Sequence, residues 1–240
     1  GDTDTATLII TVDAVNDDPV AQGTISNQTG EDADAGVDVS ITGGFTDVDG
    51  DALTYTATGL PPGLTLDPVT GKITGTIDKA ASQDGPNEDG VYTVTVTAKD
   101  PSGKEATQTF TWTVTNPAPE AIDDTAKTAE DTDVSGNVLG GAGAGAGDKA
   151  DSDPDGDTLK VTKFTIDGQD YLVGSTPTSV AITSGGVTVG TLVMSSDGSY
   201  TFSPAKDWNG TVPTVTYTIE DADGDTDTAT LIITVDAVND

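Results

Sequence analysis

The chain has 240 residues, and 41 acidic residues against nine lysines and no arginine give it a formal net charge of −32. This charge argues against a nucleic-acid partner or an anionic membrane surface. The chain contains no histidine and no cysteine, so it lacks the usual general base, a thiol nucleophile, disulfides and a zinc or copper site. Only oxygen chemistry remains, and an enzyme is disfavoured. No apolar run is long enough for a membrane span, and the first residues show no signal-peptide pattern.

The chain begins with a segment that returns at its end. Residues 1–17 read GDTDTATLIITVDAVND, and residues 224–240 repeat them letter for letter. Such identity indicates a tandem array, in which residues 1–17 are the C-terminal strand and linker copied from the preceding repeat. Leu8, Ile10 and Val12 form an apolar strand face, and a lone strand is unstable in water. We therefore expect this strand, residues 1–12, to pair with another molecule or to belong to a preceding repeat.

Prolines divide the remainder into two parts. Pro19 follows the repeated segment, and residues 116–119 read Asn-Pro-Ala-Pro. Proline fixes φ and ends strand ladders, so both positions suit domain boundaries. We predict a first domain over residues 18–117 and a second over residues 118–240.

Both predicted domains contain short runs in which apolar residues alternate with threonine. This period of two is typical of half-buried antiparallel strands, and the apolar members are Tyr92, Val94, Val96, Ala98, Phe110, Trp112, Val114, Val215, Tyr217, Ile219, Leu231, Ile233 and Val235. Turn signals such as Asp197-Gly198 separate the runs, and no helical stretch is evident. Two all-β sandwiches in series are predicted. The GGAGAGAG stretch at residues 140–147 is expected to be a flexible surface loop.

Aspartates gather in three turns. Only six of the 41 acids are glutamate, and the clusters read DVDGD at residues 47–51, DSDPDGD at 151–157 and DADGDTD at 221–227. Alternate aspartates in a loop that turns at glycine direct several carboxylates toward one centre, where they repel each other. A divalent cation with six to eight oxygen ligands relieves this repulsion, and calcium suits flexible all-oxygen sites better than magnesium does.

The sequence of these turns is compatible with two other interpretations. Residues 151–156 match the first half of an EF-hand loop, but the twelfth position is Thr162 instead of glutamate and no flanking helices are predicted. An EF-hand is therefore rejected. Asp-Gly is also a common sequence in ordinary hairpin turns, which would explain any single cluster without a bound ion. Three clusters in one strongly acidic chain favour calcium.

Several motifs resemble known families. The second domain is similar to VCBS and bacterial cadherin-like repeats, through residues 129–132 (AEDT), 155–159 (DGDTL), 197–202 (DGSYTF) and 217–221 (YTIED). The first resembles the "Putative Ig" repeats of cadherin-like architecture, through residues 45–51 (FTDVDGD), 59–64 (GLPPGL) and 71–75 (GKITG). The resemblance implies tandem Ig-like or cadherin-like β-sandwiches from the extender region of an RTX-type bacterial adhesin.

The resemblance also implies calcium ligands at the domain junctions. Carried over residue by residue, the first junction uses Asn16, Asp17, Asp18, Asp47, Asp49, Asp51 and Asp100. The second uses Asn116, Asp151, Asp153, Asp155, Asp157, Asp221 and Asp223. A third begins at Asn239 and Asp240. The second linker departs from the family pattern because Asn116 is followed by Pro-Ala-Pro and not by paired aspartates, so this junction holds fewer ions or relies on proline stiffness.

The function implied is a structural extender of a long, repetitive adhesin at the bacterial cell surface, rigidified by calcium and active in cell adhesion and biofilm. Its partners would be neighbouring repeats. The alternative is a calcium-dependent glycan- or protein-binding module, for which Trp208 is the candidate contact, although a core position suits this residue better. A hydrolase that uses an aspartate pair is a distant third interpretation.

Overall fold

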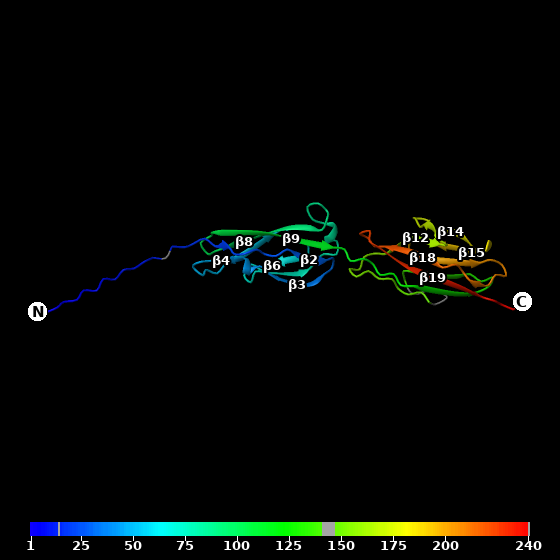
Figure 1. Cartoon of the computed structure of the whole chain (residues 1–240), viewed down its shortest axis with the longest axis horizontal. Coiled ribbons are helices and arrows are strands. Elements are labelled where there is room, and N and C mark those ends of the chain that lie inside the picture. Colours follow the sequence, from blue (N-terminus) through cyan, green and yellow to red (C-terminus); the bar gives the residue numbers. More distant parts are fainter. Residues whose placement is uncertain (14, 141–146, 240) are drawn as a thin grey trace. The chain divides into compact units, whose positions relative to one another are not determined.

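The computed structural model describes residues 1–13, 15–140 and 147–239. The predicted all-β fold is confirmed, with two short 3₁₀ turns at Thr42–Gly44 and Ala81–Gln83 (Figure 1). The chain forms two compact units. Unit 1 comprises Gly1–Gly30, Ala35–Ile77 and Val91–Thr113, and unit 2 comprises Glu31–Asp34, Asp78–Gly90 and Val114–Asp240. Two loops from the first half of the chain therefore pack with unit 2.

Unit 1 is built from two main sheets and one short strand pair. The four-stranded sheet has the order β2-β9-β8-β5, the three-stranded sheet has the order β3-β7-β6, and β1 pairs with β4. The strands are β1 (Val20–Ala21), β2 (Gln28–Glu31), β3 (Ala35–Ser40), β4 (Phe45–Thr46), β5 (Thr54–Thr58), β6 (Leu64–Leu66), β7 (Lys72–Thr76), β8 (Val91–Lys99) and β9 (Glu105–Thr115).

The core of unit 1 follows the predicted alternation. In β8 every second residue from Tyr92 to Ala98 is buried, and in β9 Phe110, Trp112 and Val114 are buried. The threonines between them lie on the other face of the sheet. Trp112 is 1% exposed and packs beside Phe110, with ring centroids 6.3 Å apart. Burial of such aromatic and β-branched side chains is the main stabilising contribution in a sandwich of this size.

Unit 2 contains a six-stranded and a four-stranded sheet. The first has the order β10-β19-β18-β12-β13, with β17 also paired to β19, and the second has the order β11-β16-β15-β14. The strands are β10 (Asp124–Ala129), β11 (Val134–Asn137), β12 (Lys160–Ile166), β13 (Gln169–Leu172), β14 (Thr178–Ser184), β15 (Val187–Met194), β16 (Ser199–Pro204), β17 (Gly210–Thr211), β18 (Val215–Glu220) and β19 (Thr226–Asp236). β10 and β19 pair in parallel.

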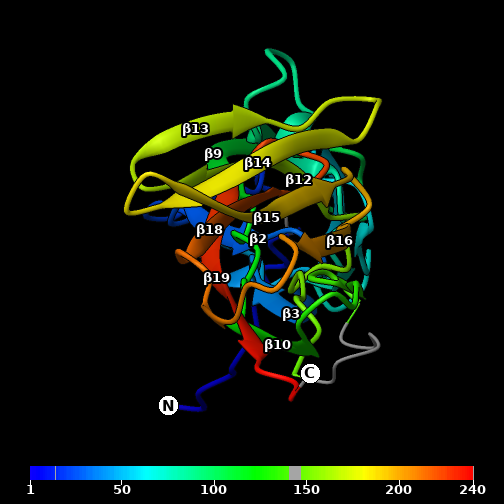
Figure 2. The same cartoon turned by 90° about the vertical axis from the view of Figure 1, so that its right-hand side faces the viewer.

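One hydrophobic cluster fills unit 2. Phe164, Phe202 and Tyr217 are fully buried in it, and Trp208 is partly buried and packs against it from the segment between β16 and β17. Figure 2 shows β13 and β14 alongside each other. A pocket between them is lined by residues that include Tyr171, and none of its lining residues belongs to the aspartate-rich turns.

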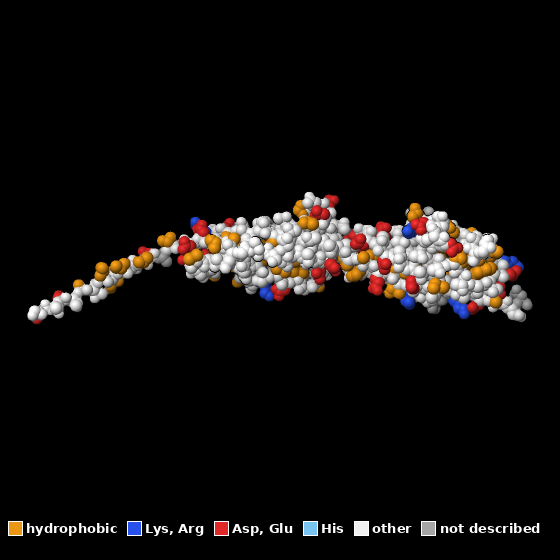
Figure 3. All heavy atoms as spheres, viewed as in Figure 1, with side chains coloured by type: hydrophobic (Ala, Val, Ile, Leu, Met, Phe, Trp, Pro, Cys, Tyr) orange, Lys and Arg blue, Asp and Glu red, His pale blue; other side chains and the backbone are white. Residues whose placement is uncertain are grey.

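The N-terminal segment forms no strand. Residues 1–13 have no strand pairing in the single chain, and their apolar side chains are exposed, as the orange atoms of this segment show in Figure 3. Residues 141–146 of the predicted flexible loop lie outside the described residues. No helix among the described residues is long and apolar enough to span a membrane.

Candidate functional site

The turn at residues 47–51 draws its carboxylates inward. Asp47 follows β4, and its Oδ1 accepts the backbone N–H groups of Asp49 and Asp51 at 3.0 and 3.3 Å. Gly50 closes the turn with a φ of +77°, which the left-handed region allows without strain only for glycine. The remaining oxygen of Asp47, Oδ2, is buried and has no hydrogen-bond partner. The local sequence therefore leaves one carboxylate oxygen without a donor.

Asp100 completes this group, which we name the Asp100 cluster and define as Asn16, Asp47, Asp49, Asp51 and Asp100. Asp100 follows β8 and is 3% exposed. One ligand atom from each of Asp47, Asp51 and Asp100 lies within 4.8 Å of the other two, and no other trio of acids among the described residues meets this criterion. Asn16 donates from Nδ2 to Asp100 Oδ2 at 2.9 Å. Three carboxylates thus face one centre beside the amide of Asn16.

The pKa values in the Asp100 cluster shift in two directions. Burial raises the pKa of Asp51, and repulsion from Asp47, Asp49 and Asp100 raises it further. Burial alone would raise the pKa of Asp100 too, but hydrogen bonds from Asn16, Lys104 and Ser102 hold it at about 2. Asp100 is therefore a fixed negative charge, whereas the ionised form of Asp51 is less favoured than in a free aspartate, and a nearby cation would offset this effect.

A second group in unit 2 repeats the contact between an asparagine and a buried aspartate, and we name it the Asp221 cluster: Asp32, Asn116, Asp153, Asp155, Asp157, Asp221 and Asp223. Asp221 follows β18 and is fully buried. Its Oδ1 accepts the N–H groups of residues 223–225 at 2.6–3.0 Å, and its Oδ2 accepts Asn116 Nδ2 at 2.9 Å. Asn116 thus contacts Asp221 as Asn16 contacts Asp100.

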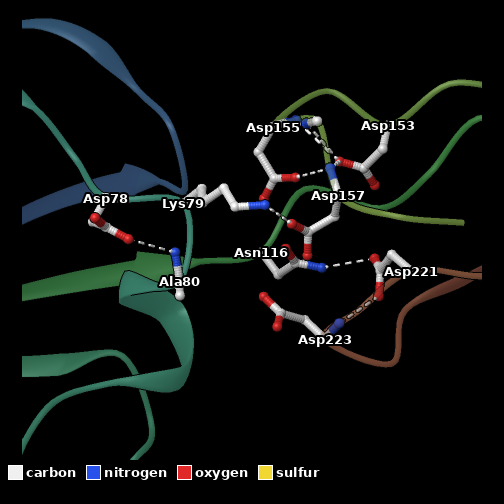
Figure 4. A network of polar contacts seen from close by, with 10 residues as sticks. Asp78, Lys79, Ala80, Asn116, Asp153, Asp155, Asp157, Asp221 and Asp223 are labelled. Atoms are coloured by element: carbon white, nitrogen blue, oxygen red, sulfur yellow. Dashed lines mark hydrogen bonds and ion pairs between the residues drawn. The ribbon is translucent and has the colours of Figure 1, made fainter.

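The loop before β12 supplies the other carboxylates. Asp153 Oδ1 accepts the N–H groups of Asp155 and Asp157, both at 3.1 Å, which repeats the arrangement around Asp47. Figure 4 shows the side chain of Asn116 lying between this loop and the turn that follows Asp221. The two aspartate-rich turns therefore flank one asparagine.

Several oxygens of the Asp221 cluster lack partners. Five are buried without a hydrogen-bond donor: Asp32 Oδ2, Asn116 Oδ1, Asp153 Oδ2, Asp155 Oδ2 and Asp223 Oδ2. A buried polar atom without a partner costs about 1–3 kcal/mol, and more when it is charged. Oxygen donors that protein groups leave unsatisfied are the ligands that calcium takes. The residues present therefore fit a hard divalent cation in both clusters.

Electrostatics in the Asp221 cluster agree with this fit. Burial raises the pKa of Asp155, with Asp153 as the main neighbour, and burial also raises the pKa of Asp223, with repulsion from Asp157 and Asp32. Lys79 Nζ lies 2.7 Å from Asp157 Oδ1, and Figure 4 shows it reaching this carboxylate. One lysine charge does not balance six aspartates.

Not every predicted ligand joins a cluster. Asp17 contributes its backbone N–H, which donates to Asp49 Oδ2 at 2.7 Å, and the exposed Asp18 pairs with Lys104 at 3.1 Å. Asp151 lies in the interior, where it accepts the N–H of Ile122 at 2.7 Å. Two further residues complete the predicted set: Asn239 is exposed at the C-terminal end, and Asp240 lies outside the described residues.

Asp151 belongs to a buried acid pair that the sequence does not reveal. Asp124 is fully buried, and its Oδ2 lies 2.9 Å from the hydroxyl of Tyr217, which is 3.4 Å from Asp151 Oδ1. Burial raises the pKa of each carboxyl to about 6, and each repels neighbouring carboxylates. Asp32 is also new: it is 4% exposed and accepts the N–H of Ser82 at 2.9 Å. Its only sequence signal is the acidic stretch at residues 31–34.

Nearly the whole chain is similar to known protein families. The family described as "Putative Ig domain" matches residues 18–115, and the bacterial cadherin-like domain family matches residues 116–237. A curated relative, the "Serine-rich adhesin for platelets" of Staphylococcus aureus (strain MSSA476), is 36% identical over 92 residues. The match covers 38% of this chain and only 4% of the adhesin, and the same protein of strain MW2 matches equally.

Solved structures give weaker likenesses. Drosophila N-cadherin EC1-4 is 14% identical with a TM-score of 0.40, covering 92% of this chain and 50% of the cadherin. Human protocadherin-24 EC1-2 is 16% identical with a TM-score of 0.36, covering 94% of this chain and all of that one. An endo-fucoidan hydrolase of glycoside hydrolase family 107 is 19% identical with a TM-score of 0.37. The match covers 92% of this chain and 29% of the hydrolase.

The two family matches agree with the all-β architecture and together span nearly the whole chain. Because the cadherin-like match alone covers half of its 240 residues, the chain belongs to the bacterial cadherin-like domain family, with a domain of the "Putative Ig" family before it.

Proposed function

We propose that this chain is a structural extender module of a long bacterial surface adhesin, in which calcium stiffens the segments before each domain. One observation carries the proposal: two clusters that share an asparagine–aspartate contact hold buried oxygens without donors, six of them in all. In each, an asparagine that precedes a domain donates to the aspartate that follows the second-to-last strand, as Asn16 does to Asp100 after β8 and Asn116 to Asp221 after β18.

Calcium would supply the positive charge that these oxygens lack. In the Asp100 cluster Asp47, Asp51 and Asp100 would bind it, and in the Asp221 cluster Asp153, Asp155, Asp157 and Asp223 would do so. Because Asn16 and Asn116 belong to the linkers, an ion held beside them ties each linker to the loops of the following domain. Without the ion the carboxylates repel each other and the linkers move more freely.

The family matches and the adhesin relative support a non-enzymatic role at the cell surface. Modules that bind calcium outside cells have dissociation constants on the order of 10⁻⁴ to 10⁻³ M. Such sites would be occupied by calcium in seawater or host fluids, and they would stay empty at the low calcium concentration of the cytosol. We infer an extracellular location, a parent of the RTX type with VCBS-like repeats, and a role in cell adhesion and biofilm.

A calcium-dependent glycan-binding module has less support. Trp208 was the candidate stacking residue, but it packs against the core of unit 2. An exposed aromatic platform is what a glycan site of this kind needs.

A double variant tests the Asp221 cluster. Asp155→Asn with Asp223→Asn removes two carboxylates whose pKa values are raised by burial and by repulsion from neighbouring carboxylates. In EDTA we expect this variant to melt roughly 3–6 °C above the unmodified chain, the shift that about 1 kcal/mol produces in a domain of this size. In 10 mM calcium the variant should instead melt below the unmodified chain, because two of its calcium ligands are missing. Differential scanning calorimetry in both buffers measures the two shifts.

The matched control removes the same charge elsewhere. Asp38 and Asp236 are exposed and pair with Lys72 and Lys127, and such surface pairs contribute little. Asp38→Asn with Asp236→Asn should keep the full calcium-induced rise in Tm. If both double variants gain as much from calcium as the unmodified chain, the Asp221 cluster is not a calcium site.

A further inference from the structure

One amino-acid segment occurs in two environments in this chain. Residues 3–13 have the same sequence as β19, Thr226–Asp236. Leu231, Ile233 and Val235 of β19 are 0–3% exposed, whereas their counterparts Leu8, Ile10 and Val12 are 76–87% exposed. Identical residues therefore form a buried central strand in one place and no strand in the other. The difference comes from the neighbouring strands and not from local propensity.

β19 occupies a defined slot in unit 2. It pairs in parallel with β10 along six residues, from Asp124↔Leu231 to Ala129↔Asp236. On its other side it pairs antiparallel with β18, from Glu220↔Thr226 to Val215↔Leu231, and β17 pairs with its C-terminal part. Alternate residues of β19 point into the hydrophobic core. We name the space between β10 and β18 the β19 slot.

We propose that residues 3–13 are a donor strand that completes the β19 slot of a second copy of unit 2. The occupant is fixed by sequence identity, because every side chain that the slot accepts from β19 is present at the same spacing in residues 3–13. The inference stands apart from calcium binding. The second copy lies in another molecule or elsewhere in a longer polypeptide, and the same slot is used in both cases.

The register of this pairing follows from that of β19. Residue numbers shift by 223, so Leu8 takes the place of Leu231 opposite Asp124 and Val215. Thr7 takes the place of Thr230 opposite Thr216, on the less buried face of the sheet. In molecules whose own β19 has left the slot, a donor strand from another molecule makes a head-to-tail contact, and contacts of this kind produce open chains of molecules.

The test uses the full chain with its own β19 disabled. In Leu231→Asp with Ile233→Asp, two charged side chains face the core, so β19 is expelled while residues 3–13 stay intact. We expect analytical ultracentrifugation to show dimers and longer linear species whose share rises with concentration. The unmodified chain should remain monomeric because its slot is filled. Adding Leu8→Asp and Ile10→Asp should abolish the association.

Cysteine cross-linking tests the register, with no background because the chain has no cysteine. A chain with β19 disabled carries Thr216→Cys. It is mixed with a second chain that has an unchanged β19 and carries Thr7→Cys. Directly opposed residues are close enough for a disulfide, so we expect a cross-linked heterodimer. A chain that carries Thr11→Cys instead, four residues out of register, should cross-link at least about tenfold less.

A synthetic peptide of residues 1–17 covers the case in which the β19-disabled chain does not fold. At saturating concentration it should restore a cooperative melting transition, followed by the fluorescence of Trp208, and a peptide with Leu8→Asp and Ile10→Asp should not. The proposal is overturned if the peptide restores nothing, if Thr7→Cys and Thr11→Cys cross-link equally, or if association persists when the slot is filled, which would indicate pairing at a sheet edge.

Discussion

Removal of calcium with EDTA is expected to lower the Tm of this chain by more than about 10 °C. A ligand that binds only the folded state at 100 times its dissociation constant stabilises that state by about 2.7 kcal/mol per site, and two sites double this effect. For domains of 100 residues or more, each 1 kcal/mol corresponds to roughly 2–6 °C. The same treatment should increase the radius of gyration in small-angle X-ray scattering, because the linkers lose their ties.

Magnesium provides the control for this experiment. It demands stricter octahedral geometry and gives up its water reluctantly, so at equal concentration it should restore far less of the lost Tm than calcium does. A general screening of the net charge of −32 would make the two ions nearly equal. Unchanged melting and scattering after chelation would contradict the proposed mechanism.

Acidification should act with opposite signs on the calcium-free and the calcium-loaded protein. Asp124 and Asp151 are buried, and the pKa of each is raised to about 6 from an ordinary value of 3.8. In the absence of calcium their ionisation destabilises the fold above pH 6, and protonation removes that cost as the pH falls toward 5. We expect the free energy of unfolding to rise by roughly 1–3 kcal/mol between pH 7.5 and 5.

The groups around Asp124 and Asp151 determine the pH range over which these two carboxyl groups titrate. Asp148, Lys149, Asp227 and the hydroxyl of Tyr217 face the pair, and the pKa of Tyr217 is raised far above this range. Asp100, with a pKa of about 2, stays ionised until much lower pH and then contributes a loss of stability.

With calcium bound, the ligand carboxylates must remain ionised, so protons compete with the ion and stability should fall over the same interval. Urea unfolding at pH 7.5, 6 and 5 in EDTA and in calcium measures both slopes. Asp124→Asn should remove about half of the rise in EDTA. Parallel slopes in the two buffers would contradict this account.

The fold could be predicted from sequence because alternation is a local signal. Tyr217 and Ile219 alternate with threonine, and each lies on the buried face of β18. The pairing of β10 with β19 could not be predicted, since a parallel partner about one hundred residues away leaves no local pattern. Residues 1–13 show the same limit, because the sequence of β19 alone does not specify whether its neighbours are present.

The aspartate clusters were also partly predictable. Asp-x-Asp-Gly-Asp turns fix their own conformation through side-chain bonds to backbone N–H groups, as Asp47 and Asp153 show. Asp151 stands two residues before Asp153 in a similar pattern, yet it turns into the interior toward Tyr217. Asp32 lies in the short segment Glu31–Asp34, which joins the Asp221 cluster because it packs with unit 2. Sequence patterns therefore locate the turns, while tertiary packing decides which carboxylates meet.

A crystal structure of the chain grown in calcium, with anomalous scattering measured at a wavelength suited to that ion, tests the central claim most directly. We expect anomalous density bounded by Asp47, Asp51 and Asp100, and a second peak among Asn116, Asp155 and Asp223. Clusters that hold only water in calcium-rich crystals, with their carboxylates turned outward, would contradict the claim that these acids bind calcium.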